Sequence, residues 1–193
     1  DTRSMLSDPQ QDYTRSLWAV RSFRKTEASP VAESTPLVRV SKVSASYVRG
    51  GEQVLSDVSF DIQRGETVAV VGESGSGKST AARVITGLLP PHAGEVIFAG
   101  EVMPADYRSR SLDQLRQIQM IYQMPDTAIN PRHKIRDILG RPLSLYLGMQ
   151  GAAKEQRLNE LMDMIEMSPK QFLDRLPSEL SGGQKQRICI AQA

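Results

Sequence analysis

The sequence has little that could cross-link the chain or bind a metal. Cys189 is the only cysteine among 193 residues. A disulfide framework, a cysteine-based structural zinc site and an iron–sulfur cluster are therefore excluded within the chain. Charge of one sign is also scarce: 24 Lys and Arg balance 22 Asp and Glu, for a net charge of +2. This balance gives no electrostatic argument for a nucleic-acid partner, and we expect none.

Long apolar runs are missing as well. The longest clean stretch is Val68–Val71, whereas a membrane-spanning helix needs about 20 apolar residues. The chain starts at Asp1 without a methionine and without the apolar region of a signal peptide. We therefore expect a chain that does not enter a membrane by itself and that is part of a longer protein. Its composition, 39% hydrophobic and 24% charged, is ordinary for a globular protein.

Residue patterns divide the chain into three parts. Residues 1–23 contain a short amphipathic stretch, and residues 24–36 are rich in Ser, Ala, Pro and Thr, which is typical of a linker. The remainder, 37–193, begins with alternating strands and becomes mostly helical beyond about residue 111. The patterns predict strands at 37–43, 54–62, 67–71, 95–98 and 120–123, helices at 79–89, 112–118 and 152–167, and a last helix starting at Ser181. The continuous β-branched run Thr67–Val71 predicts a strand buried on both faces.

A glycine-rich segment follows the predicted strand at 67–71 and precedes the predicted helix at 79–89. It matches the phosphate-loop pattern G-x-x-x-x-G-K-[ST] with Gly72, Glu73, Ser74, Gly75, Ser76, Gly77, Lys78 and Ser79. The glycines allow the backbone N–H groups to curl around phosphate oxygens, and the helix start adds positive charge. Lys78 can reach the β- and γ-phosphates, and the Ser79 hydroxyl can bind Mg²⁺. The pattern predicts nucleotide binding but not what the nucleotide is used for.

A second motif identifies the family. Leu180, Ser181, Gly182, Gly183 and Gln184 precede Lys185-Gln186-Arg187 in the helical part. Alone, this motif could be a helix start with Ser181 as N-cap. Together with the phosphate loop, it resembles the signature of ABC-type ATPases. The resemblance implies a P-loop α/β core with an antiparallel β-subdomain and a helical subdomain at about 111–193 that carries the signature.

The resemblance also assigns roles to individual residues. Gly72–Thr80 would bind the phosphates of ATP, and Tyr47 is similar to the family's aromatic residue that stacks on adenine; otherwise Tyr47 is a core aromatic at a strand end. Gln123 resembles the Q-loop glutamine, which contacts Mg²⁺ and positions the attacking water, or it is a solvated loop residue. The signature residues 180–184 would bind ATP held by a partner module. ATP and Mg²⁺ are thus the expected cofactors.

The stretch from Gln123 to Arg132 narrows the subfamily. It is similar to the Q-loop region of dipeptide, oligopeptide, glutathione and nickel importers. Residues 1–23 resemble the tail of an ATPase module of this type; otherwise they are an unrelated extension. The resemblance implies a parent with two fused modules that imports a peptide-like solute. The expected partners are a second ATPase module, membrane permease subunits and, indirectly, a solute-binding protein. The expected location is peripheral, on the cytoplasmic face of the membrane.

The resemblance stops before three family elements: the Walker B strand with its catalytic glutamate, the D-loop and the switch histidine. His92 and His133 match no switch position, and we expect both at the surface. Cys189 is expected to be buried without a redox role, and Met162, Met164 and Met167 to be core residues or else a docking surface. Missing central strands should leave an apolar face exposed around residues 67–71. Two other functions stay open: a nucleotide-binding module without catalysis, and a soluble ABC ATPase outside transport.

Overall fold

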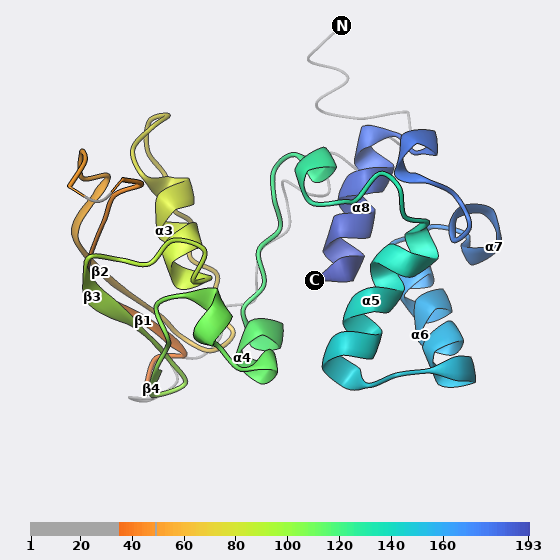
Figure 1. The fold of residues 1–193 in the computed structure, drawn as a ribbon, viewed down its shortest axis with the longest axis horizontal. Coiled ribbons are helices and arrows are strands. Elements are labelled where there is room, and N and C mark those ends of the chain that lie inside the picture. Colours follow the sequence, from red (N-terminus) through yellow and green to blue (C-terminus); the bar gives the residue numbers. More distant parts are fainter. Residues whose placement is uncertain (1–34, 49) are drawn as a thin grey trace, which may run out of the picture. The chain divides into compact units, whose positions relative to one another are not determined.

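The computed structural model describes residues 35–48 and 50–193. The expected module tail at 1–23 and most of the expected linker at 24–36 lie outside the described residues. The described part begins with strands and one helix and continues with a set of helices (Figure 1). This order agrees with the sequence pattern, including the change to helical structure near residue 111.

A four-stranded antiparallel sheet has the order β2-β1-β3-β4. In the central strand β1, Val40 pairs with Phe60 on one side and with Val96 on the other. An irregularity in the strand pairing between Val40 and Val43 allows Val40, Val43 and Ala45 all to be buried in one core. Three of the predicted strands are confirmed. The strand bounds are β1 Val38–Ala45, β2 Leu55–Ile62, β3 Ala93–Phe98 and β4 Glu101–Val102.

One helix, α3 (Lys78–Ile85), packs on β1 and buries Val84 in the core of the sheet. It is shorter than the predicted helix 79–89. Gly87 adopts φ +75°, and its N–H donates to Val84 O at 3.0 Å, which is a helix-ending geometry that favours glycine. A Cβ at Gly87 would lie 2.9 Å from the backbone N of Tyr107. The close approach of the segment around Tyr107 therefore requires glycine at position 87, where the helix ends.

Arg110 lies behind the end of α3. The residue is only 7% exposed, and its guanidinium donates to Pro104 O at 3.0 Å and to Ile85 O at 2.9 Å. Burial lowers the pKa of this guanidinium from its ordinary value. A positive charge at the carbonyl end of a helix is favourable because it complements the helix dipole. Arg110 thus joins α3 to the segment that follows β4.

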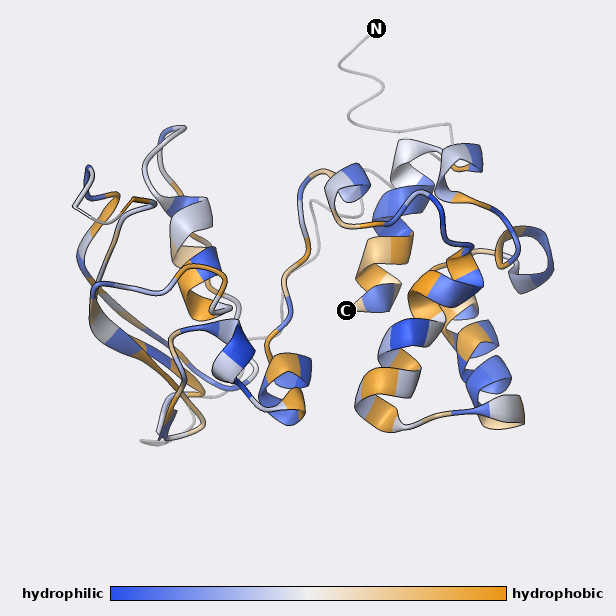
Figure 2. Cartoon of the chain, in the orientation of Figure 1, coloured by the Kyte–Doolittle hydropathy of each residue, from blue (hydrophilic) through white to orange (hydrophobic). Residues whose placement is uncertain are grey.

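Helices α5 to α8 share a second core. Ile135, Leu139, Leu158, Met162 and Ile188 are its fully buried large side chains. Figure 2 shows both hydrophobic and hydrophilic residues on α5, α6 and α8, as expected for helices with one buried side. The helix bounds are α4 Leu112–Gln117, α5 Ile135–Leu147, α6 Gly151–Met164, α7 Pro169–Phe172 and α8 Gly182–Gln192.

The predicted helix 152–167 ends early because Glu166 has φ +55° and Met167 N donates back to Met162 O at 2.9 Å. Met162 and Met167 are core residues, whereas Met164 is 71% exposed. On the surface, Arg136 of α5 donates from Nε to Asp174 at 2.8 Å and from Nη1 to Glu155 of α6 at 3.0 Å. This ion-pair network connects three segments of the helical part.

Two predicted strands are wrong. Residues 67–71 form no strand, and Val71 is 88% exposed. Residues 120–123 likewise form no strand. A β-branched or apolar run favours an extended backbone, but a strand needs a neighbour to satisfy its N–H and C=O groups. Within residues 35–48 and 50–193, no strand pairs with either segment. The apolar exposure at 67–71 agrees with the expectation for this segment.

Candidate functional site

The glycine-rich loop 72–77 leads directly into α3. Gly77 is the N-cap of α3 with φ +93°, a left-handed conformation that glycine adopts without strain. A Cβ at this position would lie 2.9 Å from Leu55 Cδ2 and 3.1 Å from Val54 O. Gly77 is therefore required both by its backbone angle and by the close approach of β2. This packing fixes the start of α3 and the direction of its first N–H groups.

Lys78 folds back over the loop that precedes it. Its Nζ donates to Gly72 O at 2.9 Å, to Glu73 O at 2.5 Å and to Ser76 Oγ at 3.4 Å. The loop thus curls around an ammonium group at the positive end of a helix. An anionic ligand bound there could accept charge-assisted hydrogen bonds from the Lys78 ammonium in place of these loop oxygens. The side chain of Ser79 is exposed in the first turn of α3, where its hydroxyl can bind a cation.

Tyr47 lies against the first two turns of α3. Its hydroxyl is 3.0 Å from Thr80 Oγ1, and Arg83 Nη1 donates to it at 3.3 Å. The Arg83 guanidinium carbon is also 5.6 Å from the centre of the Tyr47 ring. The residue nevertheless remains 53% exposed, so part of the ring is open to a planar ligand. The sequence analysis missed Arg83, although its spacing of three from Thr80 places both on one side of the helix.

The signature motif forms the start of α8, with Ser181 as its N-cap. Gln184 N donates to Ser181 Oγ at 3.3 Å, and Ser181 N donates to Gln184 Oε1 at 2.9 Å, which completes a capping box. Leu180 is buried, whereas Gly182 and Gly183 are exposed. The structure therefore confirms the N-cap geometry. The motif also presents exposed backbone N–H groups at a helix start, which suits an anion.

The next three residues of α8 bind other segments of the fold. Lys185 Nζ lies 2.6 Å from Asp126 Oδ1, and Gln186 Nε2 donates to Tyr122 O at 3.3 Å. Arg187 Nη1 donates to Ile165 O at 3.0 Å. The first two contacts hold the segment on either side of Gln123, whose own side chain is exposed. Sequence reasoning gave these residues no role, because their partners are distant in the chain.

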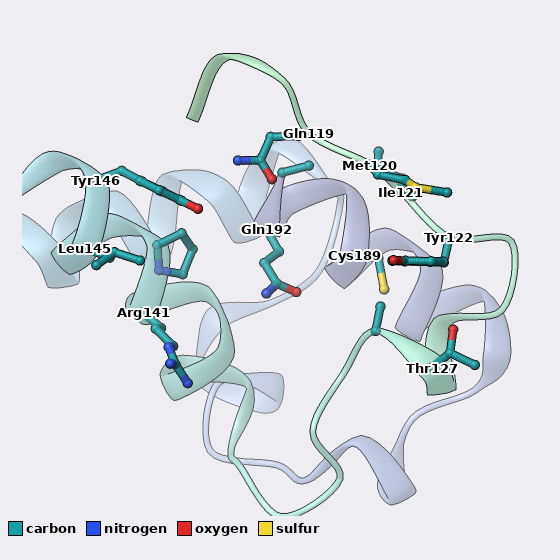
Figure 3. Close-up of a pocket in the computed structure, with 13 residues that line it drawn as sticks. Gln119, Met120, Ile121, Tyr122, Thr127, Arg141, Leu145, Tyr146, Cys189 and Gln192 are labelled. Carbon is teal, nitrogen blue, oxygen red and sulfur yellow. The ribbon is translucent and has the colours of Figure 1, made fainter. Parts of the chain in front are cut away.

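A cavity of about 350 Å³ lies beside the Gln123 segment (Figure 3). Its walls come from residues 119–122, from α5 and from the last turns of α8, which contribute Cys189 and Gln192. Cys189 is buried, as expected. Desolvation and the negative charge of Asp126 raise the pKa of the Cys189 thiol, which disfavours the reactive thiolate.

His92 and His133 are exposed, as expected. No group of three or more His, Cys, Asp and Glu side chains that could hold a metal occurs in the described part of the chain. No described helix is long and apolar enough to span a membrane.

The predicted site residues fall into two groups, each with its own contacts. Tyr47, the phosphate loop and Thr80 form one group, and the Gln123 segment with the signature helix forms the other.

Comparisons with known proteins identify the family of the chain. The ABC transporter family matches residues 55–193. The nickel import ATP-binding protein NikE of Brucella suis biovar 1 is 44% identical over 140 residues, covering 72% of this chain and 52% of the relative. NikE of Escherichia coli strain 536 is 38% identical over 164 residues, covering 81% of this chain and 61% of the relative. The chain thus spans about half to three fifths of these relatives.

Solved structures support the same fold. The structure of the ATP-binding subunit of an ABC transporter has a TM-score of 0.67 and 29% sequence identity, covering 81% of this chain and 61% of that one. A dimeric ATP-binding cassette in a post-hydrolysis state with ADP and Pi has a TM-score of 0.66 and 30% identity, covering 80% of this chain and 68% of that one. The expected fold class is therefore confirmed, and the chain belongs to the ABC transporter family.

Proposed function

We propose that the full-length protein binds ATP with Mg²⁺ at Gly72–Thr80 and hydrolyses it to drive the import of a solute. The observation that carries this proposal is the position of Lys78. Its ammonium is held by Gly72 O, Glu73 O and Ser76 Oγ inside the curl of the loop, at the N-terminus of α3. A fixed cation beside a glycine-rich loop at the N-terminus of a helix suits a polyphosphate.

The residues of the first group, together with Gln123 from the second, would bind such a nucleotide. Lys78 would bind the β- and γ-phosphates, and the exposed part of the Tyr47 ring would stack on adenine. The Ser79 hydroxyl and the Gln123 amide oxygen would bind Mg²⁺, and Gln123 would also orient the attacking water. Bound Mg²⁺ would supply charge neutralisation at the phosphates. Oxygen ligands of this kind are those that Mg²⁺ prefers.

The second group would act on the nucleotide of another ATPase module. Ser181 and the N–H groups of Gly182 and Gly183 would bind its γ-phosphate. The exposure of both glycines leaves the start of α8 open to such a partner. The dimeric cassette among the similar solved structures supports an arrangement of two modules. The second module would be fused in the same parent chain, because residues 1–23 resemble the tail of an ATPase module.

The transport function rests on the relatives. Proteins 44% and 38% identical to this chain are nickel import ATP-binding proteins, which supports an importer with membrane permease subunits. The Gln123 segment and the adjoining cavity would contact the permease at the cytoplasmic face of the membrane. The similarity of residues 123–132 to dipeptide, oligopeptide, glutathione and nickel importers underlies the prediction of a peptide-like solute, whereas the NikE relatives favour nickel. Uptake of a labelled dipeptide and of nickel by cells with and without the gene would separate the two.

The nucleotide site is tested by calorimetry on the full-length protein with Mg-ATP. Lys78→Ala should weaken binding at least tenfold, because one lost charge-assisted contact to phosphate corresponds to about 1.5–3 kcal/mol. Lys170→Ala is the matched control, because it removes the same charge from an exposed position on α7. Equal affinities for the two variants would refute the site. Phosphate release that is lost in Lys78→Ala and kept in Lys170→Ala would support hydrolysis.

A further inference from the structure

The segment that carries Tyr47 is tied to a histidine from another part of the chain. Ser46 N donates to His92 Nε2 at 3.1 Å, and Ser46 Oγ lies 2.5 Å from the same nitrogen. Ser46 Oγ is also 2.6 Å from Val48 O, and His92 N donates to Ser44 O at 2.8 Å. Ser46 itself is only 5% exposed. His92 thus holds both sides of a short turn through its backbone and its ring.

We propose that His92 is a positioning residue for Tyr47 and that protonation of its ring weakens nucleotide binding. This inference rests on the proposed function, in which Tyr47 stacks on adenine. Tyr47 follows Ser46 directly, and its hydroxyl contacts Thr80 in the first turn of α3. The hydroxyl of Tyr47 is therefore held by α3, and the backbone of the residue before it is held by His92. Loss of the Ser46–His92 bond removes one of the contacts that position the segment carrying Tyr47, beside the Arg83 contact and the Gly51 N–Val48 O bond.

The proton on His92 decides whether the anchor exists. His92 Nε2 can accept the Ser46 N–H only while this nitrogen is unprotonated. A backbone N–H cannot become an acceptor, and Ser46 is too buried for water to replace the bond easily. In the imidazolium form both ring nitrogens are donors. Nε2–H can then still donate to Ser46 Oγ, but the backbone N–H of Ser46 faces a second donor and loses its partner.

The sign of the pH effect follows from this geometry. The anchored form requires a ring whose Nε2 carries no proton, so nucleotide affinity should be higher at high pH than at low pH. The charged side chains on the neighbouring elements are Arg39 and Lys42 on β1, Asp57 and Asp61 on β2, Glu95 on β3, and Lys78 and Arg83 on α3. Among residues 35–48 and 50–193, no ion pair or hydrogen bond joins His92 to a charged side chain. The contacts of the His92 ring that change when Nε2 is protonated are therefore those with Ser46.

The experiment measures the affinity of the full-length protein for Mg-ATP at about pH 8 and about pH 5.5, the range in which histidine side chains act as proton switches. Between the higher and the lower pH, the affinity of the wild type should fall by about threefold to tenfold more than the affinity of His92→Gln, because only the wild type loses the hydrogen bond from Ser46 N. The glutamine oxygen can accept the Ser46 N–H but does not titrate. His92→Ala should bind weakly at both pH values, and His92→Gln should restore the affinity.

Two controls make the outcome specific. Mg-tripolyphosphate occupies the phosphate loop without a base, so its binding should change with pH equally in wild type and His92→Gln. Lys78→Ala should lose binding at both pH values, and failure of that control would refute the proposed nucleotide site itself. If Lys78→Ala behaves as expected but wild type and His92→Gln show the same pH dependence for Mg-ATP, the role of His92 is refuted. The comparison of wild type with His92→Gln stands even if His92→Ala does not fold.

Discussion

Ser181 has a structural role and a proposed functional role, and two substitutions separate them. As the N-cap of α8, its Oγ accepts from Gln184 N at 3.3 Å. Ser181→Ala removes this acceptor and should lower the free energy of unfolding by about 1 kcal/mol. Ser181→Asp keeps an acceptor at the N-cap and adds a negative charge at the helix start, which contributes about 0.3–1 kcal/mol. The aspartate variant should therefore be at least as stable as wild type.

The order of the Ser181 variants in ATP turnover should differ from their order in stability. If Ser181 meets the γ-phosphate of a second module, a carboxylate there opposes the phosphate charge. Two unit charges about 4 Å apart interact by about 4 kcal/mol at an effective dielectric constant of about 20. ATP turnover by Ser181→Asp should thus fall by about 100- to 1,000-fold. Ser181→Ala removes only one contact and should retain more activity, despite its lower stability.

The assay uses the full-length protein, with urea unfolding for stability and phosphate release for turnover. Binding of Mg-ATP to the protein's own phosphate loop should be unchanged in both variants. Ser178→Ala and Ser178→Asp are matched controls, because Ser178 is exposed on the short helix Pro177–Glu179 before the motif. Wild-type turnover by Ser181→Asp would refute the proposed contact with a second module. Equal destabilisation by alanine and aspartate would refute the role of the cap.

Three further predictions concern stability and the chain itself. Arg110→Met should lower the free energy of unfolding by about 1–3 kcal/mol, measured in urea, because Pro104 O and Ile85 O lose a charged donor; an unchanged value would contradict this. Arg136 lowers the pKa of Asp174, so this contact stabilises the fold above the unfolded pKa of about 4 and is lost as pH falls through the folded pKa. Asp174→Asn should flatten acid unfolding in that window, and an unchanged acid midpoint and slope would argue against it. The 193-residue chain alone should bind Mg-ATP weakly and release phosphate no faster than its Lys78→Ala variant; faster release that depends on Lys78 would place the catalytic carboxylate within the chain.

Local signals in the sequence predicted the parts of the fold that depend on local interactions. The Ser181 cap could be identified because a serine followed three residues later by glutamine satisfies the first N–H groups of a helix. The strands β1, β2 and β3 could be identified because alternating apolar residues bury one face of a sheet whose strands are all present. In both cases the partners lie inside the described part of the chain.

The wrong predictions at 67–71 and 120–123 have a common physical reason. Both segments have apolar or β-branched residues, which favour an extended backbone. Propensity cannot supply the neighbouring strand, and Val71 remains exposed in the absence of one among the described residues. Residues 120–123 are instead held by a side chain, since Gln186 donates to Tyr122 O. The sequence pattern thus describes the segment itself but not its partner.

The contacts that organise the candidate site could not be predicted for a related reason. The hydroxyl of Tyr47 meets Thr80, and Ser46 meets His92, across wide separations in the chain. No periodicity or motif connects such pairs. Motif similarity predicts Tyr47 and the phosphate loop as site residues, but only the fold shows that α3 contacts the tyrosine hydroxyl and that the turn before β3 contacts Ser46.

The signature helix combines two surfaces on one rigid element. Its first residues, Ser181–Gly183, are exposed, whereas Lys185 and Gln186 bind Asp126 and the carbonyl of Tyr122. These contacts lie within about one helical turn of the N-cap. A ligand that moves Ser181 must therefore also move Lys185 and Gln186, and with them the segment that contains Gln123. We expect binding at the start of α8 and the position of Gln123 to influence each other, because both depend on contacts of the same short helix.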